Sequence, residues 1–156
     1  MRITATLLCL ALAACSPQQQ FKTGTMPDLD GSFDFASLQI INDAGDSLTF
    51  DVYLAQDSEQ QQRGLMFVRE MPDTTGMLFI YDGDDTRSMW MRNTFIPLDM
   101  VFARSDGSVT NIVANTTPRS LRSSSSTEPA RYVLELNAGA ASHFGIGRDS
   151  RLIWGE

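Results

Sequence analysis

Short apolar and alternating segments, separated by turn residues, constrain the fold of this chain more than any other feature of its sequence. They follow one another closely from Leu38 to Trp154. Segments of this length suit strands of about five or six residues better than long helices. The sequence therefore predicts a mostly β (α+β) fold, a small barrel or sandwich of about 7–9 short strands with two short helices.

Two connections between the predicted strands have recognisable compositions. The segments 38–42 and 48–54 flank a turn that contains Gly45, and the second segment alternates between apolar and polar residues. This pattern is typical of a β-hairpin. The serine run 123–126 lies in a long polar connection, which is expected to be a mobile surface loop.

Capping signals mark the two predicted helices. Asp57 or Ser58 can accept hydrogen bonds from the free amides of a helix start, and Gly64 can end that helix. A second short helix is predicted over 138–144, where Gly145 follows as the stop signal.

The first residues have the composition of a secretory signal. The apolar run 3–14 is too short to span the ~30 Å hydrocarbon core of a bilayer as a helix. Small residues precede Cys15, as in the lipobox of bacterial lipoproteins, and Ser16 follows it. We therefore expect 1–14 to be a signal peptide and Cys15 to be lipidated, with the protein anchored in the outer membrane and facing the periplasm.

The chain beyond the signal is expected to contain one domain. Residues 15–36 are rich in Gln, Gly, Pro and Asp, which is typical of a flexible tether, and 37–156 would form the globular domain. Cys9 would leave with the signal and Cys15 would carry the lipid, so no disulfide is expected. Stability must then come from the hydrophobic core.

The overall charge restricts the partners. The formal net charge is −7 at pH 7, which disfavours nucleic acid as a partner. The protein is expected to contact a membrane through its lipid anchor. No cofactor is predicted.

Several phrases carry a resemblance to a known family. In order they are Gly64-Leu65-Met66, Gly76-Met77-Leu78-Phe79, Trp90-Met91-Arg92-Asn93-Thr94, Ile96-Pro97-Leu98-Asp99, Val133-Leu134-Glu135-Leu136 and Ala138-Gly139. Together they resemble the bacterial and archaeal family called domain of unknown function 192. The resemblance implies a compact, mostly β domain, often exported or lipid-anchored, and it implies no settled activity.

The segment 87–100, RSMWMRNTFIPLDM, supplies most of the predicted binding site. It combines an aromatic ring with hydrogen-bonding groups, a pattern used to hold a sugar or another small polar molecule. We expect a non-catalytic binding module for such a ligand, or for another envelope component. The expected site residues are Trp90, Arg92, Asn93, Asp99 and Glu135.

Two other functions compete with this prediction. Asp99 and Glu135 could act as the general acid and base of an envelope hydrolase, if the fold brings them together. Alternatively, the chain could be a structural or assembly partner without a pocket, which would show an exposed apolar patch instead. Asp99 and Glu135 could also be structural. In that case Asn93 and Asp99 would form hydrogen bonds with the backbone at a corner near Pro97.

A metal site is a further alternative, although none is predicted. Met89, Met91 and the lone His143 could hold Cu(I), which prefers soft thioether ligands. The competing explanation is that the methionines fill an irregular core.

Overall fold

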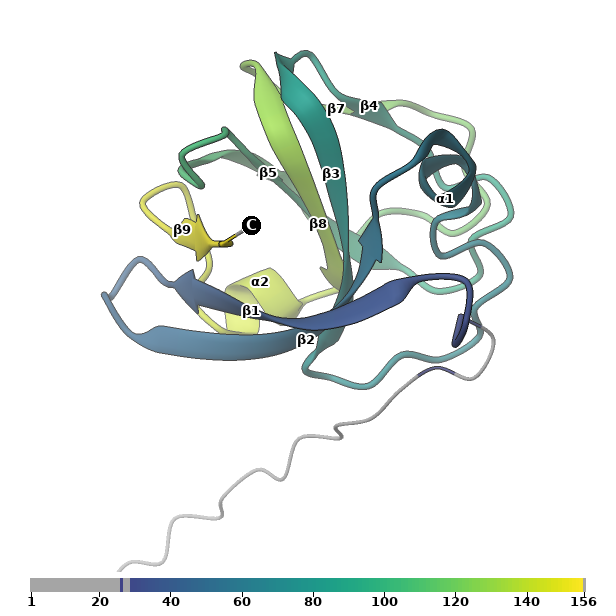
Figure 1. Ribbon diagram of the computed structural model, residues 1–156, viewed down its shortest axis with the longest axis horizontal. Helices are drawn as coiled ribbons and strands as arrows, with labels where there is room; N and C mark the ends of the chain where they lie inside the picture. Colours follow the sequence, from purple (N-terminus) through teal and green to yellow (C-terminus); the bar gives the residue numbers. More distant parts are fainter. Residues whose placement is uncertain (1–25, 27–28, 156) are drawn as a thin grey trace, which may run out of the picture.

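Nine strands and two short helices make up the part of the chain that the computed structural model describes, Met26 and residues 29–155 (Figure 1). The predicted mostly β fold with two short helices is confirmed. The expected signal peptide, 1–14, and the expected lipidation site, Cys15, lie outside the described residues.

Seven strands form one curled sheet in the order β6-β5-β8-β3-β2-β1-β9. Neighbouring strands are antiparallel except for β2 and β3, which are parallel. A separate ribbon pairs β4 with β7. The strands are β1 (Asp34–Ile41), β2 (Ser47–Ala55), β3 (Thr75–Asp85), β4 (Ser88–Met89), β5 (Leu98–Ala103), β6 (Val109–Val113), β7 (Ser124–Ser125), β8 (Ala130–Asn137) and β9 (Arg151–Ile153).

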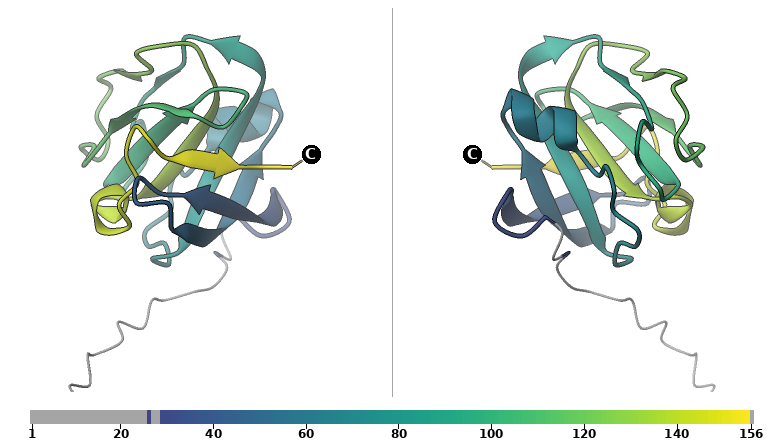
Figure 2. Two further views of the ribbon diagram at one scale, coloured as in Figure 1. Left: turned by 90° about the vertical axis from the view of Figure 1, so that its left-hand side faces the viewer. Right: turned by 90° about the vertical axis from the view of Figure 1, so that its right-hand side faces the viewer.

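The sheet curls into a half-barrel, and β9 meets the turn between β5 and β6. β9 lies beside β1 (Figure 2). On its other side, Arg151 forms a bridge with Ser108, and the Leu152 amide donates a hydrogen bond to the Gly107 carbonyl at 2.9 Å. This seam joins the end of the chain to its middle.

Gly107 is required at the seam by its geometry. Its φ is +82°, and a Cβ there would lie 2.0 Å from the Leu152 carbonyl oxygen. We expect Gly107→Ala to lower the free energy of unfolding by about 2 kcal/mol or more, through strain and loss of the bridge. Urea unfolding measures this change in free energy. Gly83→Ala is the control, since a Cβ at Gly83 meets nothing within 4 Å; equal effects of the two changes would contradict this role.

Both faces of the sheet are apolar. Alternate residues of β5 and β8 belong to two separate buried clusters. The first contains Leu98, Met100, Phe102 and Val133, and the second contains Val101, Ala103, Leu134 and Leu136. A polar residue in a central strand therefore enters one of two apolar layers.

Both predicted helices are present. In α1 (Ser58–Arg63), the Asp57 carboxylate accepts a hydrogen bond from the Gln60 amide at 2.8 Å, and the Gln60 side chain accepts one from the Asp57 amide at 3.3 Å. This reciprocal pair is a capping box, and Gly64 ends the helix. α2 (Ala140–His143) lies within the segment predicted to be helical. Neither described helix is long and apolar enough to cross a membrane.

The folded domain begins earlier than expected. Leu29 and Phe33 are buried in the first cluster, and β1 starts at Asp34. The end of the expected tether, 15–36, thus belongs to the domain, because its scattered aromatic and aliphatic side chains are core residues.

The expected serine loop also differs. Ser124 and Ser125 form β7 and pair with Met89 and Ser88, and the Ser126 amide donates to the Arg87 carbonyl at 2.9 Å. Sequence composition did not indicate this pairing, because the β-ribbon depends on partners far away along the chain.

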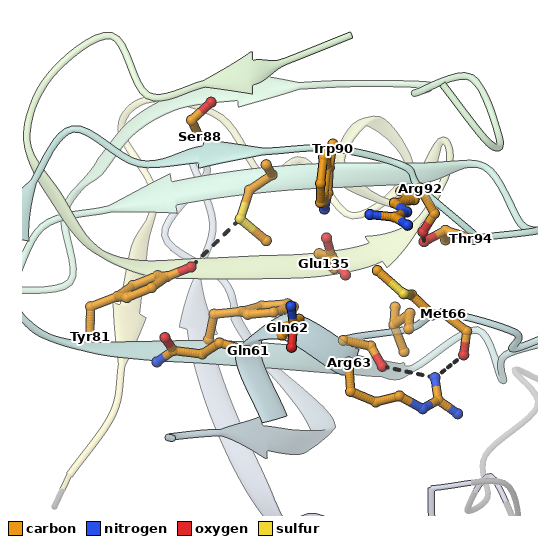
Figure 3. Close-up of a pocket in the computed structure, with 14 residues that line it drawn as sticks. Gln61, Gln62, Arg63, Met66, Tyr81, Ser88, Trp90, Arg92, Thr94 and Glu135 are labelled. Atoms are coloured by element: carbon orange, nitrogen blue, oxygen red, sulfur yellow. Dashed lines mark hydrogen bonds between the residues drawn. The ribbon is translucent and has the colours of Figure 1, made fainter. Parts of the chain in front are cut away.

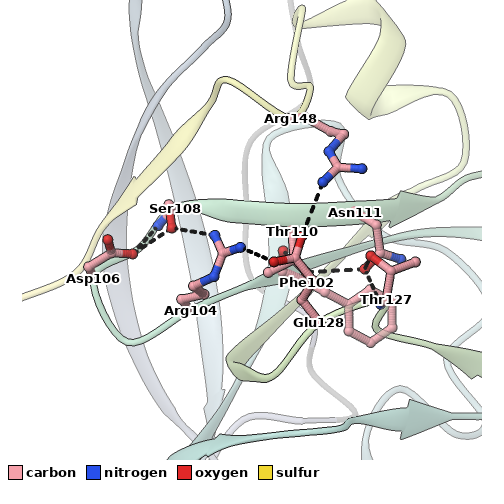
Figure 4. A network of polar contacts seen from close by, with 9 residues as sticks. All are labelled: Phe102, Arg104, Asp106, Ser108, Thr110, Asn111, Thr127, Glu128 and Arg148. Carbon is pink, nitrogen blue, oxygen red and sulfur yellow. Dashed lines mark hydrogen bonds and ion pairs between the residues drawn. The ribbon is translucent and has the colours of Figure 1, made fainter.

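A polar network fixes another loop against the sheet (Figure 4). Glu128 forms ion pairs with Arg104 and with Arg148, the second at 3.2 Å. Arg104 also donates to the Ser108 hydroxyl at 3.0 Å, next to the seam. The network thereby ties the β5–β6 turn to the start of β8.

Candidate functional site

A cavity of about 120 Å³ lies between α1, the segment 88–94 and the first apolar layer (Figure 3). Gln61, Gln62 and Arg63 lie along one side, Trp90, Arg92 and Thr94 lie along the other, and Glu135 lies between them. The parallel connection between β2 and β3 positions α1 here, since it carries the chain back across the sheet.

Glu135 occupies the centre of the sheet. It pairs with Met77 on one side and with Met100 on the other, and only 4% of its surface is exposed. Within residues 29–155, its carboxyl group has no hydrogen-bond or ion-pair partner, although it lines the cavity. Burial raises the pKa of Glu135 to about 8, so the carboxyl is mostly protonated at neutral pH.

Tyr81 and Met89 close one end of the cavity. The Tyr81 hydroxyl donates to the Met89 sulfur at 3.6 Å, and the Arg87 guanidinium lies 4.0 Å from the centre of the Tyr81 ring. Burial raises the pKa of Tyr81, Arg87 lowers it, and the Glu135 carboxyl raises it. The phenol is therefore neutral at neutral pH, and it uses its proton in the hydrogen bond to Met89.

Trp90 and Arg92 form the mouth of the cavity. Trp90 is 48% exposed, which is unusual for so large an apolar side chain. The Arg92 guanidinium lies 5.5 Å from the Trp90 ring centre. An exposed ring with an adjacent cation beside a concave space can contact an entering molecule through stacking and hydrogen bonds.

Three of the five expected site residues line this cavity: Trp90, Arg92 and Glu135. Asn93 lies at the corner behind them, with a left-handed φ of 57°. Its carbonyl accepts a hydrogen bond from the Phe67 amide at 2.9 Å, and its side chain donates to the Met66 sulfur at 3.8 Å. The structure thus gives Asn93 a role in shaping the corner.

Asp99 lies on the other face of the sheet from Glu135. It is fully buried, and its two carboxylate oxygens accept hydrogen bonds from the amides of Asn115 and Ala141, at 2.8 and 3.0 Å. Ala141 belongs to α2, whose N-cap Gly139 has no side chain to provide such a bond. Asp99 therefore caps α2 from a distance.

The acid–base pair that a hydrolase would need is not formed. Asp99 pairs with Leu136, whereas Glu135 pairs with Met100. Because side chains alternate between the faces of a strand, this register sends the two carboxyl groups to opposite layers. The expectation that Asp99 shares a pocket with Glu135 is corrected on this ground.

The three residues considered for Cu(I) are also separated. Met89 lines the cavity, whereas the buried Met91 sulfur accepts a hydrogen bond from the Thr116 hydroxyl at 3.2 Å. His143 lies in α2, on the far layer. Within the described residues, no group of three or more His, Cys, Asp or Glu side chains could hold a metal ion.

Sequence reasoning missed Tyr81 and the residues of α1. The alternation of Met77, Phe79 and Tyr81 on one face of β3 was a usable signal for Tyr81. No local signal places α1 above β8, since that position depends on the crossover.

The fold and its cavity make this chain a small half-barrel domain with a buried carboxyl group beside an exposed tryptophan. The chain belongs to the DUF192 family, described as "Uncharacterized ACR", whose family model matches residues 39–154.

Two solved structures are similar to this chain. A Sinorhizobium meliloti 1021 protein, whose description suggests a transcription regulator, is 39% identical with a TM-score of 0.76; the match covers 78% of this chain and 94% of that protein. A protein of unknown function from Novosphingobium aromaticivorans DSM 12444 is 34% identical with a TM-score of 0.77, and the match covers 84% and 91%. No curated protein matched the chain.

Proposed function

We propose that this protein is a non-catalytic binding module of the cell envelope, which receives one small polar group of a ligand, such as a glycan, in the cavity beside Trp90. The observation that carries the proposal is the Glu135 carboxyl group, which is buried, faces the cavity and lacks a partner among the described residues. Buried polar groups are normally hydrogen-bonded, so an exception calls for an explanation. A ligand that accepts a hydrogen bond from the Glu135 carboxyl group, or donates one to it, would explain why this group is buried.

The size and chemistry of the cavity limit which ligands can bind there. An apolar cavity of about 150 Å³ holds one benzene molecule, so a cavity of about 120 Å³ admits one terminal group or part of one ring. A protonated Glu135 both donates and accepts, as a sugar hydroxyl or an amide does. The remainder of such a ligand would lie against Trp90 at the mouth.

Other functions receive less support. Hydrolysis by paired carboxylates lacks its second group, since Asp99 lies in the other layer. The description of the Sinorhizobium protein suggests a transcription regulator. Direct binding of this chain to nucleic acid is disfavoured by its net charge of −7. The envelope location rests on the expected signal peptide and on lipidation of Cys15.

A thermal-shift screen of neutral sugars, amino sugars and small amides tests the proposed binding. We expect hits whose affinity falls at least ~10-fold in Trp90→Ala and in Glu135→Leu, since each change removes a contact worth ~1.4 kcal/mol or more. Ile153→Ala is the control, because Ile153 is also an exposed apolar residue, at 43%, and lies on β9. Hits that bind both cavity variants as tightly as the unmodified protein would reject this site.

A further inference from the structure

Beside the cavity lies a second surface, here called the arginine–aromatic face, made of Arg63, Phe67, Arg69, Phe95 and Arg119. The rings of Phe67 and Phe95 meet edge to face, with centres 5.9 Å apart. The Arg63 guanidinium lies 5.4 Å from the Phe67 ring centre. The guanidinium groups of Arg69 and Arg119 each lie 5.1 Å from the ring centre of Phe95.

The arginines of this face have no counter-ions among the described residues. None of the three forms an ion pair with a carboxylate in the described part of the chain, although Glu70 directly follows Arg69. In contrast, Arg104 and Arg148 share Glu128 (Figure 4). Two guanidinium groups on one ring repel each other, so the face attracts anionic groups from outside.

The backbone of the face adopts conformations that are costly for its residues. Phe67 has a φ of 70° and Arg119 a φ of 61°, in the left-handed region that bulky side chains rarely adopt. The Phe67 amide donates to the Asn93 carbonyl at 2.9 Å, and the Arg119 amide donates to the Thr94 carbonyl at 3.0 Å. The first bond holds a phenylalanine that is 51% exposed and the second holds an exposed arginine, and such strain is concentrated at functional sites.

We propose that the arginine–aromatic face docks a short acidic segment of another protein, in which carboxylates alternate with apolar side chains. Arginine and aromatic residues are enriched in the cores of protein interfaces, and they dominate binding energy there. A planar guanidinium binds a carboxylate through two parallel hydrogen bonds. The apolar side chains of the segment would cover the exposed ring of Phe67.

The charge of the whole chain selects a short segment over a long polyanion or an anionic membrane. The chain carries a net charge of −7 despite these arginines, so the remainder of the chain is more acidic still. A nucleic acid or a charged bilayer would extend beyond the face and be repelled. A segment that ends within the face avoids this repulsion.

Fluorescence anisotropy with a labelled short peptide, Asp-Phe-Glu-Phe-Asp-Gly, tests the proposal. We expect the protein to bind this peptide at low ionic strength and to lose binding in high salt, because the contacts are ionic. A peptide with Asn and Gln in place of Asp and Glu should not bind. No binding of the acidic peptide, or equal binding of the two peptides, would overturn the proposal.

Variants locate the binding. Arg69→Gln combined with Arg119→Gln should weaken binding at least ~10-fold, whereas Arg148→Gln combined with Arg151→Gln makes the same charge change elsewhere and should weaken it by less than ~3-fold. Phe67→Asn should weaken binding without unfolding the chain, because asparagine tolerates a positive φ. Equal losses in the two double variants would overturn the proposal.

Two further comparisons separate the alternatives. Glu135→Leu should leave peptide binding unchanged, so this result is independent of ligand binding in the cavity. Tighter binding of a single-stranded DNA oligomer or of phosphatidylglycerol vesicles than of the peptide, lost in the Arg69 and Arg119 double variant, would replace the proposed partner by a polyanion or a membrane.

Discussion

Glu135→Gln should raise the free energy of unfolding by about 4 kcal/mol at pH 8 but by only ~1 kcal/mol at pH 5. Burial raises the pKa of the Glu135 carboxyl from its ordinary value of 4.5 to about 8 in the fold. Between these values the folded chain keeps the proton and the unfolded chain releases it. Stability from Glu135 is therefore lost as pH rises, at up to ~1.4 kcal/mol per pH unit. Glutamine stays neutral and avoids this loss.

Urea unfolding of both proteins at several pH values measures the difference. Glu59→Gln is the matched control, since it makes the same chemical change at an exposed position on α1. A difference between Glu135→Gln and the unmodified protein that stays constant from pH 5 to pH 8 would show that Glu135 is not held neutral by burial. A residue that lowers stability in its own fold is a strong candidate for function.

Asp99→Ala should have the opposite effect and lower the free energy of unfolding by roughly 3–5 kcal/mol. The change leaves the buried amides of Asn115 and Ala141 without an acceptor and opens a small void. Asp99→Asn should lower the free energy of unfolding by less than Asp99→Ala does, because the asparagine side chain offers one acceptor oxygen instead of two.

Chemical unfolding at one pH, with Asp149→Ala as an exposed control, measures the loss. The Asp99 variants, where they remain folded, should still bind a cavity ligand, since Asp99 faces the other layer. An Asp99→Ala protein as stable as the control would contradict the capping role.

Local patterns predicted the elements of this fold well. The hairpin around Gly45 and the capping box of α1 were predicted because their signals lie within a few residues of one another. The strand that begins at Ser88 ends at Met89, since the Thr94 amide donates a hydrogen bond to the Met91 carbonyl and Asn93 adopts a left-handed conformation.

The composition of the site was harder to predict. The alternation of side chains places Asp99 on the opposite face of its strand from Leu98, and Glu135 on the opposite face from Leu134. It does not show which apolar layer each leucine enters. Leu98 is in the first cluster and Leu134 in the second, so the two carboxyl groups diverge. Only the register between β5 and β8 decides this, and register is a long-range property of the sheet.

Ligand binding at the cavity can be observed directly in a Trp154→Phe protein. Trp154 has a buried ring nitrogen without a partner among the described residues, so phenylalanine should be tolerated, and Trp90 then remains as the tryptophan of the chain. NMR spectra of the Trp90 indole and of the carbon-13-labelled Glu135 carboxyl would be recorded with each hit from the screen. Binding in the cavity predicts that both signals shift together along one saturating curve. Hits that bind while both signals stay unchanged would contradict it.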